Sequence, residues 1–373
     1  MERRIKVNIL TSGRFHVLDL ARELDKNGFD VLFYSFVPSW RAKLFGLPRR
    51  CVSSIFWIIL PLAIIERKIL PGKRWIRNIR RVVQDQVTGC IMRKADVTIA
   101  MSGSYMHSTE KAKAKGSLLI VERGSKHIYE QKRILEAIPS NKGKKIIGDD
   151  VVIREIHDYD LADYIAIASS HVRDSFLIHH YPAEKMFLNP YGVDVSKFHP
   201  IKRPKKYDLI MVGNWSYQKG CDLIASAVKD MNLSFIHVGK IGDLDFPNDN
   251  HFTHIDAVEQ SCLVDYYNQA KVFVLPSRQD GFGMVFSQAL ACNLPIVGST
   301  DSGAPDLKKM IGYPEFISII KDYTVDSVVE AIQNEMTQYE KLDGTSYAID
   351  AIPQLSWDAY GKRYSDFLRS ILW

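Results

Sequence analysis

Several features that would place this sequence of 373 residues in a specialised class are absent. It has only five cysteines, which are scattered, and no CxxC pair or Cys/His cluster has the spacing of a zinc site. The opening residues, MERRIKVNIL, lack the apolar core of a signal peptide and are better interpreted as a first strand. We therefore expect reduced thiols, no metal centre and a cytoplasmic protein.

Acidic residues are nearly missing from residues 41–81. Eleven Lys or Arg and a single acid, Glu66, give this segment a charge of +10, whereas the whole chain carries +6. The segment includes the apolar run VSSIFWIILPLAII (52–65), which Pro61 interrupts. As a helix the run would span roughly 21 Å, short of a hydrocarbon core of roughly 30 Å. We expect it to lie in the interface of an anionic membrane, at the inner face of the cell membrane, rather than to span the bilayer.

The residues predicted to contact the membrane surround this apolar run. Arg77, Arg80 and Arg81 have helical i, i+3, i+4 spacing and should share one basic face. Two alternatives stay open: the run could be a buried helix with a solvated basic rim, and nucleic acid could use the same charge. No recognised nucleic-acid fold is present, and the apolar run favours lipid. The predicted interface residues are Arg49, Arg50, Trp57, Arg67, Lys68, Arg77, Arg80 and Arg81.

Strand-like apolar runs alternate with helical patterns along the chain. Continuous runs rich in β-branched residues are typical of buried parallel strands. A polar, proline-containing stretch at 195–208 interrupts the alternation as a linker. We expect strands near 5–10, 31–36, 97–100, 117–122, 164–169, 209–213, 233–239, 272–277 and 295–300, and helices near 17–28, 220–230, 261–270, 284–292 and 356–373. This pattern predicts two α/β domains of the doubly wound kind.

The expected boundaries place the ligand site between the two domains. The first domain should cover residues 1–195, the second 196–355, and a closing helix 356–373 could cross back to the first. In open parallel sheets, ligands bind outside the carboxyl ends of the strands, so a shared cleft is the expected site.

Two loops of the second domain could bind phosphate. VGNWSYQKG (212–220) is a strand end followed by Lys219 and Gly220 at a helix start, where free N–H groups favour an anion. RQDGFGMVFSQAL (278–290) has the same strand–loop–helix form, and its two glycines let the backbone approach a ligand closely. Two such loops on one sheet edge are more persuasive than either alone.

At this point the sequence resembles a known family. The run VFVLPSRQDGFGMVFSQALACNLPIVGSTDSGAPDL (272–307) is similar to the signature of the retaining glycosyltransferases of family 4, which have the GT-B fold: PS, an E-x7-E arrangement around GFG, and a P-[IV]-V strand. The passages ADYIAIASSHVRDSF and MFLNPYGVDVSKFHP (within 162–200) and VGNWSYQKG resemble further family motifs. The resemblance implies two Rossmann-like domains that face a central cleft, and a metal-independent enzyme without a cofactor.

The resemblance also implies roles for individual residues. Lys219 would contact the diphosphate of a nucleotide-sugar donor, and the backbone of Gly281, Phe282 and Gly283 would approach its sugar and phosphates. Asp280, the first acid of the pair, would hold a sugar hydroxyl beside the reacting carbon, and Gln288 would bond the ribose. Acids of DYD (158–160) and DLD (243–245) are expected to be exposed loop residues rather than metal ligands.

Three positions depart from the family pattern. Asp280 and Gln288 stand where glutamates are usual, and Asn214 stands where the phosphate loop usually has arginine. A neutral acceptor is weaker than a charged one by roughly twofold, and without a guanidinium one bidentate phosphate clamp is missing. The donor site is therefore electrostatically poorer than the family pattern.

The first domain should supply the other wall of the cleft. TSGRFH (11–16) links the first strand and helix, and Gly13 suits a close approach to the diphosphate, although an ordinary turn would also explain it. VERGSKH (121–127) ends a strand that faces the cleft. His127 is the candidate catalytic residue, with Glu122 and Arg123 behind it on the acceptor side; the alternative is that this histidine is structural.

Three functions remain open from the sequence. The first is a retaining glycosyltransferase that moves a sugar from a nucleotide-diphosphate donor to a membrane-associated glycan or lipid-linked acceptor, in cell-envelope polysaccharide assembly. The second is a sugar-nucleotide epimerase, which would not need the membrane segment. The third is a non-enzymatic or weakly active relative that binds a sugar nucleotide, as the three departures would allow.

Overall fold

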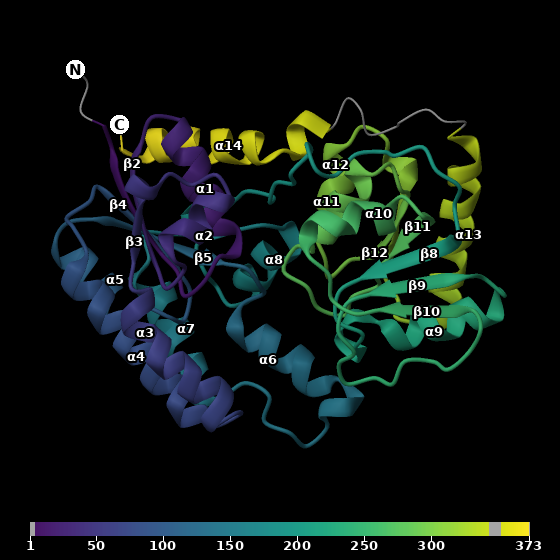
Figure 1. Ribbon diagram of the computed structural model, residues 1–373, viewed down its shortest axis with the longest axis horizontal. Coiled ribbons are helices and arrows are strands. Elements are labelled where there is room, and N and C mark those ends of the chain that lie inside the picture. Colours follow the sequence, from purple (N-terminus) through teal and green to yellow (C-terminus); the bar gives the residue numbers. More distant parts are fainter. Residues whose placement is uncertain (1–3, 343–351, 373) are drawn as a thin grey trace.

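Two parallel sheets, each covered by helices on both faces, form the protein (Figure 1). The computed structural model describes residues 4–342 and 352–372. Within them, the first sheet has the strand order β3-β2-β1-β4-β5-β6-β7 and the second β10-β9-β8-β11-β12-β13. Every paired strand runs parallel to its neighbour. This arrangement confirms the predicted GT-B architecture.

The strands and helices have the following bounds in chain order. The strands are β1 Lys6–Leu10, β2 Asp30–Ser35, β3 Val52–Ser54, β4 Val97–Met101, β5 Leu118–Arg123, β6 Tyr164–Ile167, β7 Met186–Leu188, β8 Tyr207–Val212, β9 Phe235–Val238, β10 Phe252–Ile255, β11 Ala270–Val274, β12 Ile296–Ser299 and β13 Ile317–Ile320. The helices are α1 Phe15–Lys26, α2 Ser39–Leu44, α3 Phe56–Ile64, α4 Arg74–Ile91, α5 Met106–Ala114, α6 Ile128–Ala137, α7 Asp149–Leu161, α8 Ser170–Ile178, α9 Cys221–Asp230, α10 Leu263–Tyr267, α11 Met284–Ala291, α12 Ala304–Met310, α13 Val325–Lys341 and α14 Trp357–Leu372.

The central strands are apolar because helices cover both of their faces. Val272, Phe273 and Val274 of β11 have no exposed surface, as expected for a strand in the middle of such a sheet. The predictions missed the short strands β3, β7, β10 and β13, each of which lies at or next to a sheet edge. These segments have only three or four residues, too few for a recognisable pattern.

Helix α14 returns from the second domain to the first. It runs along the top of Figure 1 and lies beside α1. The hydroxyl of Tyr364 donates to Glu122 Oε1 of β5 at 2.7 Å. Gly361 lies so close to α1 that a Cβ there would be 2.2 Å from Cβ of Glu23. The closing helix therefore crosses back to the first domain, as the sequence allowed.

Helices α3 and α4, which contain much of the basic, apolar segment 41–81, lie at the lower left of the first domain in Figure 1. The apolar run is not one element: β3 takes its first residues, and α3 contains Pro61. Trp57 is 79% exposed and Ile58 52% exposed, so α3 is not the buried core helix of the alternative interpretation. Among the described residues, no helix has both the length and the apolarity needed to cross a membrane.

Two details of the sequence analysis need revision. Arg77, Arg80 and Arg81 all lie in α4, but their charge is partly neutralised, because Glu66 accepts from Arg80 at 2.5 Å and lies 3.5 Å from Arg77. Asp158 of DYD is not an exposed loop acid: it is buried in α7 and accepts from the Gly103 N–H at 2.7 Å. Burial raises the pKa of Asp158 to about 6.

Candidate functional site

Each sheet reverses its strand order at one point, and these two points face the gap between the domains. In the first sheet the reversal lies between β1 and β4, and the loop after β1 contains Gly13. In the second sheet it lies between β8 and β11, whose following loops contain Lys219 and Asp280. Such switch points are where open α/β sheets bind ligands. The candidate phosphate loops of the sequence therefore lie where this fold places a site.

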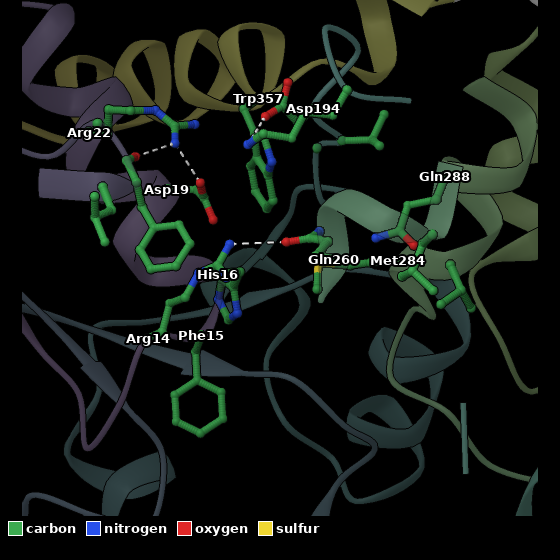
Figure 2. Close-up of a pocket in the computed structure, with 18 residues that line it drawn as sticks. Arg14, Phe15, His16, Asp19, Arg22, Asp194, Gln260, Met284, Gln288 and Trp357 are labelled. Carbon is green, nitrogen blue, oxygen red and sulfur yellow. Dashed lines mark hydrogen bonds and ion pairs between the residues drawn. The ribbon is translucent and has the colours of Figure 1, made fainter. Parts of the chain in front are cut away.

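A cavity of about 540 Å³ opens between the domains (Figure 2). That volume is within the usual range of small-molecule sites, roughly 300–1,000 Å³. From the first domain, the cavity is lined by Arg14, Phe15, His16, Asp19, Arg22, Leu44, Phe45 and Gly46. The segment between β7 and β8 adds Gly192, Val193, Asp194 and Lys197. The second domain adds Gln260, Leu263, Met284, Val285 and Gln288, and α14 adds its first residue, Trp357. Of the predicted site residues, only Gln288 lines this cavity.

Gln288 is presented to the cavity by α11. Its side chain is 5% exposed, and Oε1 accepts from the Tyr267 hydroxyl at 3.0 Å. Because the oxygen is engaged inside the domain, the amide NH₂ is the group left for a ligand, and it points toward the cavity in Figure 2. A hydroxyl can accept that hydrogen bond as readily as it can donate one, so an amide at this position remains suited to a sugar hydroxyl.

Lys219 and Asp280 form a direct ion pair beside α11. Lys219 Nζ lies 2.6 Å from Asp280 Oδ2, and the two side chains are 21% and 17% exposed. The other oxygen, Oδ1, accepts from the Gly281 N–H at 2.9 Å. The structure thus brings together the residues predicted for diphosphate and sugar, which are 61 positions apart in sequence. A cation and an acid therefore lie side by side where the second sheet reverses its strand order.

The glycine loop 280–283 packs directly against the first domain. A Cβ on Gly281 would lie 1.8 Å from the carbonyl oxygen of Gly124, so only glycine fits there. Gly283 caps α11 with a φ of 77°, which favours glycine. The Gly281 carbonyl accepts from Ser169 Oγ at 2.6 Å and lies 3.1 Å from His171 Nε2. Gly281 therefore serves the contact between the domains, and Gly283 the start of α11.

The other residues predicted to bind the donor do not line the cavity. Asn214 is exposed at the end of β8, and its side chain supplies no cation. Phe282 is buried and packs edge-on against Tyr191, with ring centroids 5.6 Å apart. Gly13 lies under the Phe15 ring, where a Cβ would be 3.3 Å from the ring edge. Only the backbone of Gly13 and Phe282 is suited to a ligand.

A further ion pair joins the two walls. Lys126 Nζ lies 2.6 Å from Asp301 Oδ1, and their side chains are 12% and 25% exposed. Burial opposes ionisation of Asp301, but the hydrogen bonds from Lys126 and Tyr323 outweigh it and lower the pKa of this carboxyl. The pair helps to hold the cleft closed around the glycine loop.

His127 lies apart from the cavity, contrary to the predicted catalytic position. It caps α6, is 5% exposed, and stacks on His179 with centroids 4.1 Å apart. Tyr159 and Phe176 pack around it. Burial, followed by the neighbouring His179, lowers the pKa of His127 to about 4. This geometry corrects the sequence interpretation: the ring belongs to an aromatic cluster within the first domain.

Glu122 and Arg123 also face inward rather than toward an acceptor. Arg123 donates to Glu155 Oε1 at 2.9 Å, to Gln131 at 2.6 Å and to the Lys126 carbonyl, so it braces the loop that follows β5. Glu122 is 2% exposed and binds His16 and Tyr364. Neither side chain lines the cavity, although Glu122 contacts His16, which does.

Sequence reasoning missed Arg14 and His16, which line the cavity from the start of α1. Arg14 donates to Gln260 Oε1 across the cleft at 3.1 Å, and its guanidinium lies 3.6 Å above the Phe45 ring. Burial lowers the pKa of Arg14. The available signal was their place in the TSGRFH loop, directly after a strand at a switch point.

Comparison with known proteins adds independent information. Residues 194–348 match the family model described as "Glycosyl transferases group 1". A GDP-mannose-dependent alpha-(1-6)-phosphatidylinositol monomannoside mannosyltransferase of Mycobacterium tuberculosis is 24% identical over 251 residues, which cover 58% of this chain and 64% of the relative. The chain thus spans under two thirds of that relative's length.

Solved structures share the fold over nearly the whole chain. Sucrose-phosphate synthase from Thermosynechococcus elongatus superposes with a TM-score of 0.70 at 14% identity, covering 99% of both chains. Anabaena HepE, solved in complex with UDP-glucose, gives a TM-score of 0.67 at 11% identity, covering 98% of this chain and 100% of HepE.

Proposed function

Since residues 194–348 match the model of the glycosyl transferases group 1 family, we propose that the protein transfers a sugar from a nucleoside-diphosphate sugar to an acceptor. The observation that carries this proposal is the Lys219–Asp280 pair, 2.6 Å apart, at the switch point of the second sheet. It lies beside the helix that presents Gln288 to the interdomain cavity. The relative named as GDP-mannose-dependent and the HepE complex with UDP-glucose support a nucleotide sugar as donor.

The proposed mechanism relies on charged groups that are preorganised before the donor binds. Lys219 stabilises the diphosphate as negative charge develops on the leaving group, which is where preorganised electrostatics contribute most. Asp280 holds a hydroxyl of the transferred sugar, and the Gly281–Gly283 backbone allows close approach. We propose that transfer retains the anomeric configuration, with the acceptor entering on the face from which the diphosphate leaves. None of the residues used requires a metal ion.

A donor screen tests the proposal. The protein is incubated with UDP-glucose, UDP-galactose, UDP-N-acetylglucosamine and GDP-mannose, and release of UDP or GDP is measured with and without lipid extract. We expect slow hydrolysis of one donor and faster release with acceptor. Tight nucleotide binding with no turnover of any donor would favour the second candidate, a binding protein without transferase activity, which Asn214 in place of a phosphate-clamping arginine would suit.

We also propose that the acceptor is lipid-linked and that the protein works at the inner face of the cell membrane, in cell-envelope polysaccharide assembly. Exposed apolar side chains, which are unusual on a soluble surface when they cluster, support this placement. They follow one another on α3, the π-turn Ile65–Ile69 and α4, among basic residues. These exposed side chains are Trp57, Ile58, Ile64, Ile69, Trp75, Ile79, Val82 and Ile91.

Vesicle sedimentation tests the membrane placement. We expect binding to vesicles with anionic lipid, weaker binding to neutral vesicles, and incomplete release by salt, because salt screens charge but not apolar contact. Trp57→Ser with Ile58→Ser should remove the salt-resistant part, whereas Arg67→Gln with Lys68→Gln should remove only the salt-sensitive part. Indifference of the wild type to anionic vesicles at low salt would favour a soluble acceptor.

A further inference from the structure

Arg14 is the one basic residue of the cavity lining that forms no ion pair with a described residue. The other three are each paired with a carboxylate: His16 with Glu122 at 2.9 Å, Arg22 with Asp19 at 2.6 Å and Lys197 with Asp194 at 2.6 Å. The two acids of the lining, Asp19 and Asp194, are therefore already neutralised. The positive charge of Arg14 is the one that a ligand could neutralise.

The surroundings of Arg14 hold its guanidinium in place without neutralising it. The group lies 3.6 Å above the Phe45 ring and donates across the cleft to Gln260 Oε1 at 3.1 Å, a neutral acceptor. Burial lowers the pKa of Arg14, although the charges of Asp19 and Glu259 oppose this effect. A partly buried cation whose partners are neutral is unfavourable until an anion reaches it. The cavity is therefore suited to an anionic ligand.

Helix α1 begins beside the same guanidinium. Arg14 directly precedes the helix, and Phe15 and His16 of its first turn also line the cavity. No side chain caps this end, so the first N–H groups of α1 have no side-chain acceptor. The start of a helix favours negative charge. The helix and the guanidinium thus favour an anion in the same part of the cavity.

Arg14 and Gln288 line this cavity from opposite walls (Figure 2). Gln288 is the residue expected to bind the ribose of the donor. The first phosphate of a nucleotide is joined to the ribose through one carbon atom, so it must stay near that cavity. Lys219 does not line the cavity and remains for the second phosphate. We propose that Arg14 binds the phosphate next to the ribose, and that it supplies from the first domain the guanidinium that Asn214 lacks in the second.

The chemistry of a guanidinium fits this role. It can donate two parallel hydrogen bonds to one phosphate, which an ammonium group cannot do. Its bond to Gln260 uses one N–H group, and the guanidinium has no other hydrogen bond to a described residue. Arg14 can therefore keep its contact with the second domain while it binds the phosphate. This inference rests on the proposed function, and it names a binding residue rather than a step of the reaction.

Arg14→Gln is the first test, read with nucleotides that differ only in phosphate number. Uridine, UMP and UDP, and the guanosine series, are compared by calorimetry with competition against the tightest ligand. We expect the variant to lose about tenfold or more in affinity for the monophosphate and the diphosphate, the scale of a hydrogen bond to a charged group. Affinity for the nucleoside should stay unchanged. Lys26→Gln is the matched control, because Lys26 lies at the other end of α1, is 57% exposed and is outside the cavity.

Two further variants sharpen this reading. Arg14→Lys keeps the charge but not the planar fork, so it should keep only part of the affinity. Lys219→Ala should weaken binding of the diphosphate but not of the monophosphate. Unchanged monophosphate affinity in Arg14→Gln would overturn the proposal. An equal loss for the nucleoside would also overturn it, because Arg14 would then only shape the cleft.

Asn214→Arg tests whether Arg14 replaces the missing arginine. Asn214 is exposed at the end of β8, in the loop that leads to Lys219. The introduced guanidinium should strengthen UDP or GDP binding more in the Arg14→Gln background than in wild type, where the phosphate is already clamped. Equal gains in the two backgrounds would show independent cations and would overturn the replacement.

Activity separates the inference from the proposed function. If wild type turns over no donor but Arg14→Gln loses phosphate-dependent affinity, the transferase proposal fails while the inference stands. If a donor is turned over and Arg14→Gln binds UMP, GMP, UDP and GDP as wild type does, the inference fails while the function stands. A lower kcat/KM with unchanged nucleotide affinity would assign Arg14 to a phosphate of the acceptor and would overturn the donor assignment.

Discussion

The two walls of the cleft were built from loops of the same kind, yet only one holds its predicted residues where a ligand could use them. In the second domain, Lys219 and Asp280 form an ion pair at 2.6 Å, and Gln288 lines the cavity. In the first domain, His127 lies in an aromatic cluster, and Arg123 braces its own loop. His16, which the sequence did not single out, occupies the cavity instead.

The difference shows what a motif can specify. In the second domain, the glycine loop and α11 are contiguous, so short-range spacing determines how Asp280 and Gln288 lie. In the first domain, the orientation of Glu122 depends on Tyr364, which is 242 residues away. A wall made by distant segments cannot be predicted from local spacing, even when its strand has been located correctly.

Replacing Asp280 should give the largest effect on the second wall. Asp280→Asn removes the charge that holds the sugar, and we expect kcat/KM to fall by roughly a hundredfold or more, the scale of losing one positioned group. UDP or GDP affinity should not fall, because Lys219 loses its internal partner. Transfer assays measure kcat/KM, and calorimetry measures the affinity for UDP or GDP. Asp256→Asn is the control, since the Asp256 side chain is 97% exposed. A parallel loss of nucleotide affinity would contradict the separation of roles.

Gln288 should have a smaller effect. Gln288→Ala removes both the Tyr267 contact and the NH₂ offered to the ribose, so nucleotide affinity should fall by about 1 kcal/mol. Gln288→Glu can still accept from Tyr267 and from a ribose hydroxyl and should bind as well as wild type or better. Calorimetry with UDP and GDP compares the affinities of the two variants with that of wild type. If the Glu variant folds but no longer binds, the ribose assignment is wrong.

The Lys126–Asp301 pair joins the two walls, and its loss should open the cleft. The folded pKa of Asp301 is lowered, so the pair contributes at pH values above the ordinary aspartate pKa of about 3.9 and is lost as pH falls through the lowered value. At pH 5–8 the cleft should stay closed. Asp301→Asn should favour opening at every pH by roughly 1 kcal/mol. Small-angle scattering measures the radius of gyration, which should increase when the cleft opens. An equal radius of gyration for variant and wild type would remove the pair from the closing contacts.

His127 should have the smallest effect on transfer. Since its pKa is lowered to about 4, it stays neutral in the physiological range and should add no step to the pH profile. His127→Phe keeps an aromatic ring in the cluster and should leave kcat/KM within about twofold. Steady-state kinetics decide the matter. A decrease in kcat/KM of more than tenfold without loss of stability would show that His127 belongs to the site. The contrast between the two walls would then be wrong.

Much of the fold could be predicted because its central strands are buried on both faces. β1, β4, β8 and β11 appear as apolar runs, and the linker lacks periodicity. The short edge strands were missed because β3 and β7 have three residues each, too few to show a pattern. Phe15 has a φ of 34°, unusual for a bulky residue, and no pattern indicated that the loop would turn there and bring His16 into the cavity.

Binding of UDP and GDP to Lys219→Ala tests the central claim most directly. If Lys219 neutralises the diphosphate of the donor, calorimetry should show affinity for the preferred nucleotide weakened by about 1.5–3 kcal/mol, the scale of a charged hydrogen bond. Lys229→Ala removes a lysine from the same region, in the last turn of α9, and should bind as wild type. Wild-type affinity in Lys219→Ala would contradict the assignment of this wall as the donor site.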